Sequence, residues 1–253
     1  MTFLSDTRIE SPVTKTLRYH GGEGIFTYWD PEQKEEFIFA LDRFIPLAGR
    51  SMITGYCKQA PKGKGNIWSN EVENMNEVLN VSIGGNCVFS GKWKDIKLEV
   101  KAKGGGFTPV CYADWDGEIV RILFSGAARG PWFDLVKIAH RTEGKPGVVI
   151  TGFGDGEGSI PYKFPIFRLN EVLPETLERA IELKTELDQF FVDYAKAKGE
   201  VESDGMNQET EADEHYQADP EEVNAELQEI AATESTEKNH QAYQDVDGDE
   251  VPF

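Results

Sequence analysis

The feature that most restricts the fold of this chain is a series of short segments rich in β-branched and aromatic residues, spread between residues 24 and 124. Turn-forming glycine, asparagine and proline residues separate many of these segments, as in Gly84-Gly85-Asn86 and Gly104-Gly105-Gly106. Repeated short strands with such punctuation predict an antiparallel β-barrel or sandwich. The segments are Gly24–Trp29, Glu36–Leu41, Ser51–Cys57, Val78–Ile83, Ile96–Lys103, Phe107–Trp115 and Glu118–Phe124.

One helix is expected to interrupt the strands. Pro131 suits a first helical position, and apolar residues from Trp132 to Ala139 then recur at helical spacing. Two further strands are expected at 148–153 and 162–169. A five-stranded oligonucleotide-binding barrel places its helix between the third and fourth strands. The order therefore predicts a mainly β, oligonucleotide-binding-like antiparallel barrel with extra strands and one internal helix.

Asp116-Gly117 lies between two of the predicted strands, and this dipeptide is a strong signal for a two-residue hairpin. Downstream of the body, an amphipathic helix is expected over residues 175–198, between Pro174 and the helix-stopping Gly199. Its apolar stripe would pack on the body or join a second subunit of a homo-oligomer. The stripe consists of Leu177, Ala180, Ile181, Leu187, Phe190, Phe191 and Tyr194.

The negative charge of the chain is concentrated in its last part. Residues 200–253 contain eighteen acidic residues and one basic residue, Lys238, so that they supply −17 of the total formal charge of −19. Residues 1–199 therefore have a net charge of −2, and such a body can still carry a basic groove. The scarcity of large apolar residues predicts a disordered acidic linker over residues 199–244, with a transient helix after Asp219-Pro220.

The final nine residues, 245–253, combine clustered acids with a proline and a phenylalanine. Pro252 stiffens the approach to Phe253, whose ring can enter an apolar slot of a partner. The acidic residues would steer this tip toward basic surfaces. The expected domains are therefore a body at 1–174, a helix at 175–198, a linker at 199–244 and a partner-recruiting tip at 245–253. The tip residues expected to bind the partner are Asp247, Asp249, Glu250, Val251, Pro252 and Phe253.

The segment Asp249-Glu250-Val251-Pro252-Phe253 resembles the C-terminal tip of bacterial single-stranded DNA-binding proteins. In combination with an oligonucleotide-binding-like body, the chain resembles the divergent single-stranded DNA-binding proteins of bacteriophages. This resemblance implies a protein that coats single-stranded DNA during phage replication, recombination or repair. It also implies that the tip recruits replication or recombination enzymes.

Binding of single strands requires cations for the phosphates and exposed rings on which bases stack. Several expected strands and loops interleave the two kinds of side chain. Loop or turn placement favours exposure of Lys62, Lys64, Trp93 and Lys94, whereas aromatic residues in strands are more often part of a core. The full candidate set is Arg43, Arg50, Tyr56, Lys58, Lys62, Lys64, Trp68, Lys92, Trp93, Lys94, Lys97, Lys101 and Lys103.

Two other functions stay open at this stage. Asp95, Glu99 and Lys101 contain the Glu-x-Lys pairing of some magnesium-dependent nucleases, although no Pro-Asp element precedes them. An acidic DNA mimic that inhibits a DNA-binding enzyme is the second alternative. The chain is not expected to be an enzyme or to bind a cofactor, since it contains no Walker loop or dinucleotide motif.

The three cysteines, Cys57, Cys87 and Cys111, are widely spaced and form no CxxC pair. Neither a disulfide framework nor a zinc site is expected, and buried thiols in a reducing cytoplasm are the simpler interpretation. No apolar segment approaches 18 residues, and no signal peptide is recognised at the N-terminus. We therefore expect neither secretion nor membrane insertion.

Overall fold

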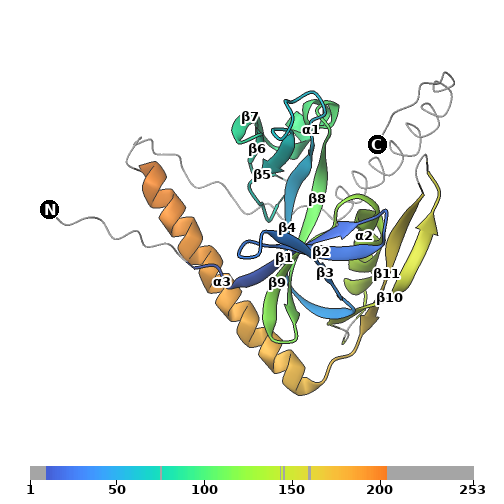
Figure 1. Ribbon diagram of the computed structural model, residues 1–253. Helices are drawn as coiled ribbons and strands as arrows, with labels where there is room; N and C mark the ends of the chain where they lie inside the picture. The colour runs from blue at the N-terminus through green and yellow to red at the C-terminus, as the bar shows by residue number, and fades with distance from the viewer. Residues whose placement is uncertain (1–9, 75, 143, 145, 159–160, 204–253) are drawn as a thin grey trace. The chain divides into compact units, whose positions relative to one another are not determined.

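The computed structural model describes residues 10–203 except 75, 143, 145, 159 and 160 (Figure 1). This part of the chain is mainly β, with eleven strands and three α-helices. The strands are β1 (Val13–His20), β2 (Ile25–Asp30), β3 (Glu35–Phe39), β4 (Arg43–Tyr56), β5 (Asn66–Ser69), β6 (Leu79–Ile83), β7 (Asn86–Gly91), β8 (Gly105–Trp115), β9 (Glu118–Leu123), β10 (Gly147–Gly156) and β11 (Tyr162–Asn170). The helices are α1 (Trp93–Ala102), α2 (Arg129–Ala139) and α3 (Pro174–Ser203), with a short 3-10 turn at Gly126–Ala128.

The strands form one sheet in the order β3-β2-β1-β9-β8-β4-β5-β6-β7. The long strand β4 organises it, because β4 pairs with β8 from Ile45 to Gly55. On its other edge β4 pairs with β10 at its start and with β5 at its end. All pairings are antiparallel except that of β1 with β9, which is parallel and departs from the predicted all-antiparallel arrangement.

The predicted barrel does not close within the described residues. The ordered path ends at β3 and β7, which do not pair with each other. The end of β1 meets β11 through two hydrogen bonds, from Lys163 N to Gly21 O at 2.7 Å and from the Tyr19 hydroxyl to Lys163 O at 2.8 Å. The mainly β prediction is therefore confirmed, and the sheet is open.

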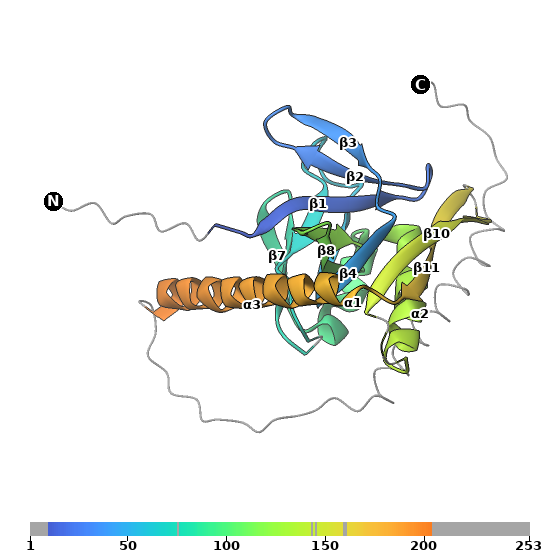
Figure 2. The same cartoon turned by 90° about the horizontal axis from the view of Figure 1, so that it is seen from below.

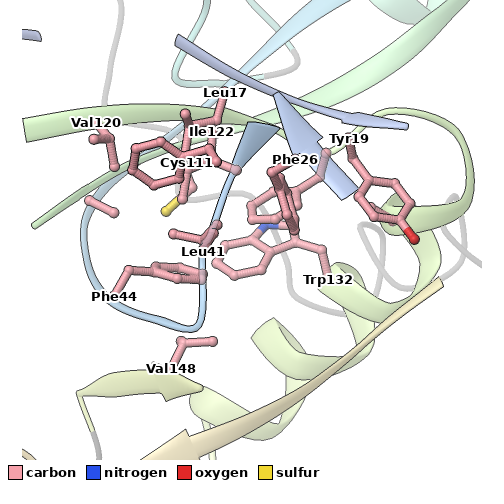
Figure 3. Close-up of a cluster of buried hydrophobic side chains, with 14 of the residues drawn as sticks. Leu17, Tyr19, Phe26, Leu41, Phe44, Cys111, Val120, Ile122, Trp132 and Val148 are labelled. Atoms are coloured by element: carbon pink, nitrogen blue, oxygen red, sulfur yellow. The ribbon is translucent and has the colours of Figure 1, made fainter. Parts of the chain in front are cut away.

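The largest core lies between α2 and one face of the sheet (Figure 3). Trp132 of α2 stacks on Phe124 at a centroid distance of 4.2 Å and also contacts Phe44 and Phe167. Leu17 and Ile122, from the parallel pair of strands, are fully buried in the same cluster. The predicted internal helix is thus confirmed as α2, whose buried Trp132 and Leu135 attach it to the sheet.

The expected strand over Ile96–Lys103 is wrong, because these residues belong mostly to the helix α1. Trp93, Ile96 and Val100 are buried, at the helical spacing i, i+3 and i+7, whereas Leu98 is 76% exposed. In a strand, Ile96, Leu98 and Val100 would point to the same face, so Leu98 would have to be buried together with the other two. One internal helix was predicted, and two are found.

The helix α3 covers part of the opposite face of the sheet, which is one of the two arrangements expected from its apolar stripe; Ile181 and Tyr194 of that stripe are exposed. Ala180 and Leu187 are buried against Val110 and Tyr112 of β8. In Figure 1, α3 is the long helix beside β1 and β9, and Figure 2 shows the same helix from below. The helix continues to Ser203, so Gly199 does not end it.

Other expectations also differ from the structure. The strands β1, β5 and β7 were not predicted. Cys57 and Cys111 are buried as expected, but Cys87 is exposed on the strand β7. Within the described ranges, no helix has the length and apolar character needed to cross a membrane.

The predicted hairpin between β8 and β9 is confirmed. Trp115 pairs with Glu118, and both turn residues have positive φ angles, 49° for Asp116 and 91° for Gly117. These angles are those of a type I′ turn, which favours glycine at its second position.

Candidate nucleic-acid interface

The structure divides the predicted binding residues between two opposite faces of the β4-β5-β6 part of the sheet. Thr54 pairs with Trp68 and Tyr56 pairs with Asn66, so Tyr56 and Trp68 lie on the same face. Ile53 and Ile67 point to the other face, where they form a core with α1. The lysines of α1 therefore lie on the reverse side of the sheet from Tyr56 and Trp68.

Trp93 is unsuited to base stacking, contrary to the sequence prediction. Its side chain is 3% exposed and packs against Phe107 at a centroid distance of 6.1 Å. The preceding Lys92 occupies the N-cap of α1, and Lys94 and Lys101 are exposed on the same helix. At the start of α1, the aromatic residue of the Lys92-Trp93-Lys94 sequence is therefore part of the core, and its two lysine neighbours are exposed.

Four other predicted lysines gather at the end of the sheet. Lys58, Lys62 and Lys64 belong to the loop between β4 and β5, which is closed by a hydrogen bond from Cys57 N to Gly65 O at 2.7 Å. This loop meets the turn between α1 and β8, where Lys103 Nζ donates to Gln59 Oε1 at 3.4 Å. We refer to Lys58, Lys62, Lys64 and Lys103 as the lysine end.

The charges of the lysine end have no carboxylate partners among the described residues. Neither these four lysines nor those at 92, 94, 97 and 101 form an ion pair within the part of the chain that the structure describes. Of the other lysines in the described ranges, Lys15, Lys137, Lys184 and Lys196 pair with carboxylates, whereas Lys34 and Lys163 form no ion pair there. Charges without a carboxylate partner are free to bind phosphates, so the lysine end is a ready anion-binding surface.

The close packing of this end depends on glycine. A Cβ atom at Gly65 would lie 2.7 Å from the carbonyl oxygen of Cys57 and 2.7 Å from the ring of Tyr56. Gly65 therefore allows the β4–β5 loop to lie against Tyr56. The loop in this way holds its lysines beside a ring that is 50% exposed.

The face that contains Tyr56 and Trp68 continues across the sheet to β1 and β2. Arg18 pairs with Leu123 of β9 and with Thr27 of β2, and Leu123 pairs with Val110 on the same face. Trp29 is two residues beyond Thr27 and 59% exposed. We define the curled face by six residues that share this side of the sheet, Arg18, Trp29, Thr54, Tyr56, Trp68 and Thr108.

Two side-chain contacts show that the sheet curls toward this face. Three strands separate β5 from β1, so a flat sheet would hold them about 19 Å apart. Nevertheless Arg18 Cζ lies 4.9 Å from the centre of the Trp68 ring. Glu71, which follows β5, also forms an ion pair with Arg121 of β9. Side chains stand roughly perpendicular to a sheet, so these contacts require curvature.

Two hollows lie on the curved side. The first, of about 630 Å³, is lined by Arg18, Trp29 and Glu36 among others. The second, of about 500 Å³, lies beside α3 and is lined by Arg50, Arg121 and Tyr194 among others. Val13 and Thr16 line both hollows, so the two adjoin along β1.

A hydrogen-bonded group borders the first hollow. The His20 ring lies 2.8 Å from the Thr27 hydroxyl, which donates to Glu36 at 2.6 Å. The hydrogen bond from Thr27, assisted by His20 and Arg18, lowers the pKa of Glu36. Glu36 therefore remains ionised near neutral pH and offsets part of the positive charge of Arg18.

The two predicted arginines have protein partners. Arg50 forms an ion pair with Glu73 at 2.5 Å, and its guanidinium lies 3.7 Å from the centre of the Phe191 ring. Arg43 is exposed at the start of β4, 3.8 Å from Asp116, and lies outside the curled face. Arg18 and Trp29 were not predicted as binding residues. Alternate residues of a strand lie on one face, so the sequence of β2 could have indicated that Trp29 lies on the same face as Ile25 and Thr27.

The described residues hold no group of three or more histidine, cysteine, aspartate or glutamate side chains arranged to bind a metal ion. Asp95 and Glu99, considered above for magnesium binding, are both exposed on α1. The predicted acidic linker and the tip lie largely or wholly outside the described residues. Comparisons with protein families, curated proteins and solved structures find no match to this chain.

Proposed function

We propose that this protein binds single-stranded DNA without sequence preference along the curled face. The observation that supports this most is that Tyr56, Trp68 and Trp29 share one curved side of the sheet with Arg18, beside lysines that lack carboxylate partners. Aromatic platforms flanked by cations are the common design of proteins that bind single strands. The binding does not require a closed barrel, only an accessible curved face.

The two parts of the interface have different roles in this proposal. Bases stack on the exposed rings, with Tyr56 nearest the lysine end and Trp29 at the far side of the curled face. Each stacked base contributes about 1–3 kcal/mol. The lysine end neutralises phosphates and releases counterions, which makes the affinity depend on salt.

The acidic segment adds a second role. We infer that the linker separates the body from the tip, and that residues 245–253 recruit replication or recombination enzymes through their acids and Phe253. Coating of exposed strands by the body would prevent reannealing, while the tip would raise the local concentration of the enzymes. In a phage-infected cell this is the function of a phage single-stranded DNA-binding protein.

Fluorescence anisotropy with a labelled oligothymidine of about 30 nucleotides tests the proposal. The variant Lys58→Ala/Lys62→Ala/Lys64→Ala should bind more weakly than the intact chain, with a smaller dependence on salt. The matched control is Lys94→Ala/Lys97→Ala/Lys101→Ala, which removes three lysines from the opposite side of the sheet. This control should bind like the intact chain.

Three results would refute the proposal. Equal losses in the two triple variants would mean that binding depends on total charge and not on the curled face. Cleavage of the oligonucleotide in magnesium would indicate a nuclease. No binding by the intact chain would exclude coating of single strands and would leave a DNA mimic as the alternative.

A further inference from the structure

The hollow beside α3 is built differently from the rest of the curled face. Its walls come from the strands β1, β4, β5, β8 and β9 and the residues after β5 on one side, and from the second half of α3 on the other. It has a volume of about 500 Å³ and opens next to the first hollow at Val13 and Thr16. The hollow lined by Arg18 and Trp29 of the curled face therefore adjoins this one.

Aromatic side chains of α3 form one wall of this hollow. Phe191 is held by the fold, because its ring packs edge-on against Tyr112 at 5.1 Å and lies under Arg50. Tyr194, one turn later, is 56% exposed, and its ring contacts only Phe190 among the described rings, at 5.9 Å. Tyr194 thus offers a free ring at the mouth of the hollow.

The strand side of the hollow contributes two guanidinium groups. Arg50 pairs with Glu73, and Arg121 pairs with Glu71, which also accepts a hydrogen bond from Tyr112. A guanidinium has five N–H donors, and the Nε atoms of both arginines are buried without a partner in the described part of the chain. The buried Nε atoms cannot reach a ligand, and the carboxylates are bound by Nη2 of each arginine. The donors that remain for a ligand are the Nη1 groups, which have no partner among the described residues.

We propose that single-stranded DNA bound on the curled face continues into this hollow, where a base stacks on Tyr194 and its phosphate faces Arg50 and Arg121. This inference rests on the proposed function and extends it, because it makes α3 one wall of the binding groove. An exposed ring opposite two guanidinium groups fits a nucleotide better than an apolar peptide, because a phosphate can accept hydrogen bonds from guanidinium nitrogens that Glu73 and Glu71 do not use.

Substitutions on α3 test the inference in the full-length chain. Tyr194→Ala should weaken binding to a long oligothymidine about tenfold and reduce the number of nucleotides that each protein occludes. Tyr194→Phe retains the ring and should bind normally. Val192→Ala, at an exposed position of the same helix that does not line the hollow, is the matched control and should also bind normally.

The outcomes separate this inference from the proposed function. If the intact chain binds and Tyr194→Ala shows the same affinity and occluded length, α3 is not part of the groove, and the inference is wrong while the proposed function stands. Equal weakening by Val192→Ala would also overturn it, because the effect would then come from the helix and not from the ring. If the intact chain does not bind, both proposals fail. Thermal melts should show unchanged folding for all three variants, since both side chains are largely exposed.

Discussion

Substitution of Arg179 by alanine should strongly destabilise the fold, because it removes the ionic partner of a buried carboxylate. The side chain of Asp114 has no exposed surface and lies on β8, next to the hairpin. Arg179 of α3 donates to its two oxygens at 3.1 and 3.3 Å, and Gly117 N donates at 2.8 Å. This ion pair therefore connects α3 to the sheet.

The structure allows the size of the effect to be estimated. Removal of one partner of a buried ion pair typically costs 3–5 kcal/mol, because a charge is left without compensation. The Arg179 side chain is 41% exposed, so water can enter after its removal, and Gly117 retains its hydrogen bond. We therefore expect Arg179→Ala to lower the free energy of unfolding by about 3 kcal/mol.

Urea denaturation followed by tryptophan fluorescence measures this cost. The midpoint should fall by about 1 M or more. In a double-mutant cycle, Arg179→Ala should cost less than about 0.5 kcal/mol when Asp114 is already alanine. A decrease in the free energy of unfolding of less than about 1 kcal/mol in the single variant would refute the argument, because so small a cost is typical of an ion pair on the surface.

Three further predictions concern the core, the pH dependence and the acidic segment. Trp93→Phe should cost less than about 1.5 kcal/mol in thermal melts, because the indole N–H has no hydrogen-bond partner among the described residues, whereas Trp93→Ala should cost about 3–5 kcal/mol. Burial raises the pKa of Tyr19 to about 12. As the pH rises, the Tyr19 hydroxyl therefore loses its proton at a lower pH in the unfolded chain than in the folded one, and stability should fall between about pH 10 and about pH 12. Tyr19→Phe should flatten that part of an alkaline stability curve; an unchanged slope would contradict the assignment. Removal of residues 200–253, which have a net charge of −17, should tighten oligothymidine binding at low salt and reduce its salt dependence. Unchanged affinity of the truncated chain would exclude competition between this segment and the DNA.

Local sequence signals predicted several elements correctly. The Asp116-Gly117 dipeptide specifies its turn through residues that tolerate positive φ, and α2 and α3 are visible as apolar stripes at helical spacing. The prediction of a strand at α1 was wrong because three aliphatic residues at alternating positions are compatible with a strand as well as with a helix. Burial of Trp93 decides between the two, and it depends on a cluster that includes Ile53 of β4 and Ile67 of β5, which are remote in sequence.

Sequence could predict the components of the candidate site but not their arrangement. Tyr56 and Trp68 were expected to bind, and the register of β4 with β5 places them on one face. Arg18 joins them only because β1 pairs in parallel with β9, more than a hundred residues later in the chain. Neither that pairing nor the separation of the α1 lysines from the curled face has a local signal in the sequence.

Photocrosslinking of the intact protein to an oligothymidine that contains bromodeoxyuridine tests the central claim most directly, because it identifies the residues in contact with bases. If the bases stack on the curled face, crosslinked peptides should contain Tyr56, Trp68 or Trp29. Exclusive crosslinking to peptides of α1 or α2 would place the strand on another surface. That result would contradict the proposed interface even if the protein bound single-stranded DNA.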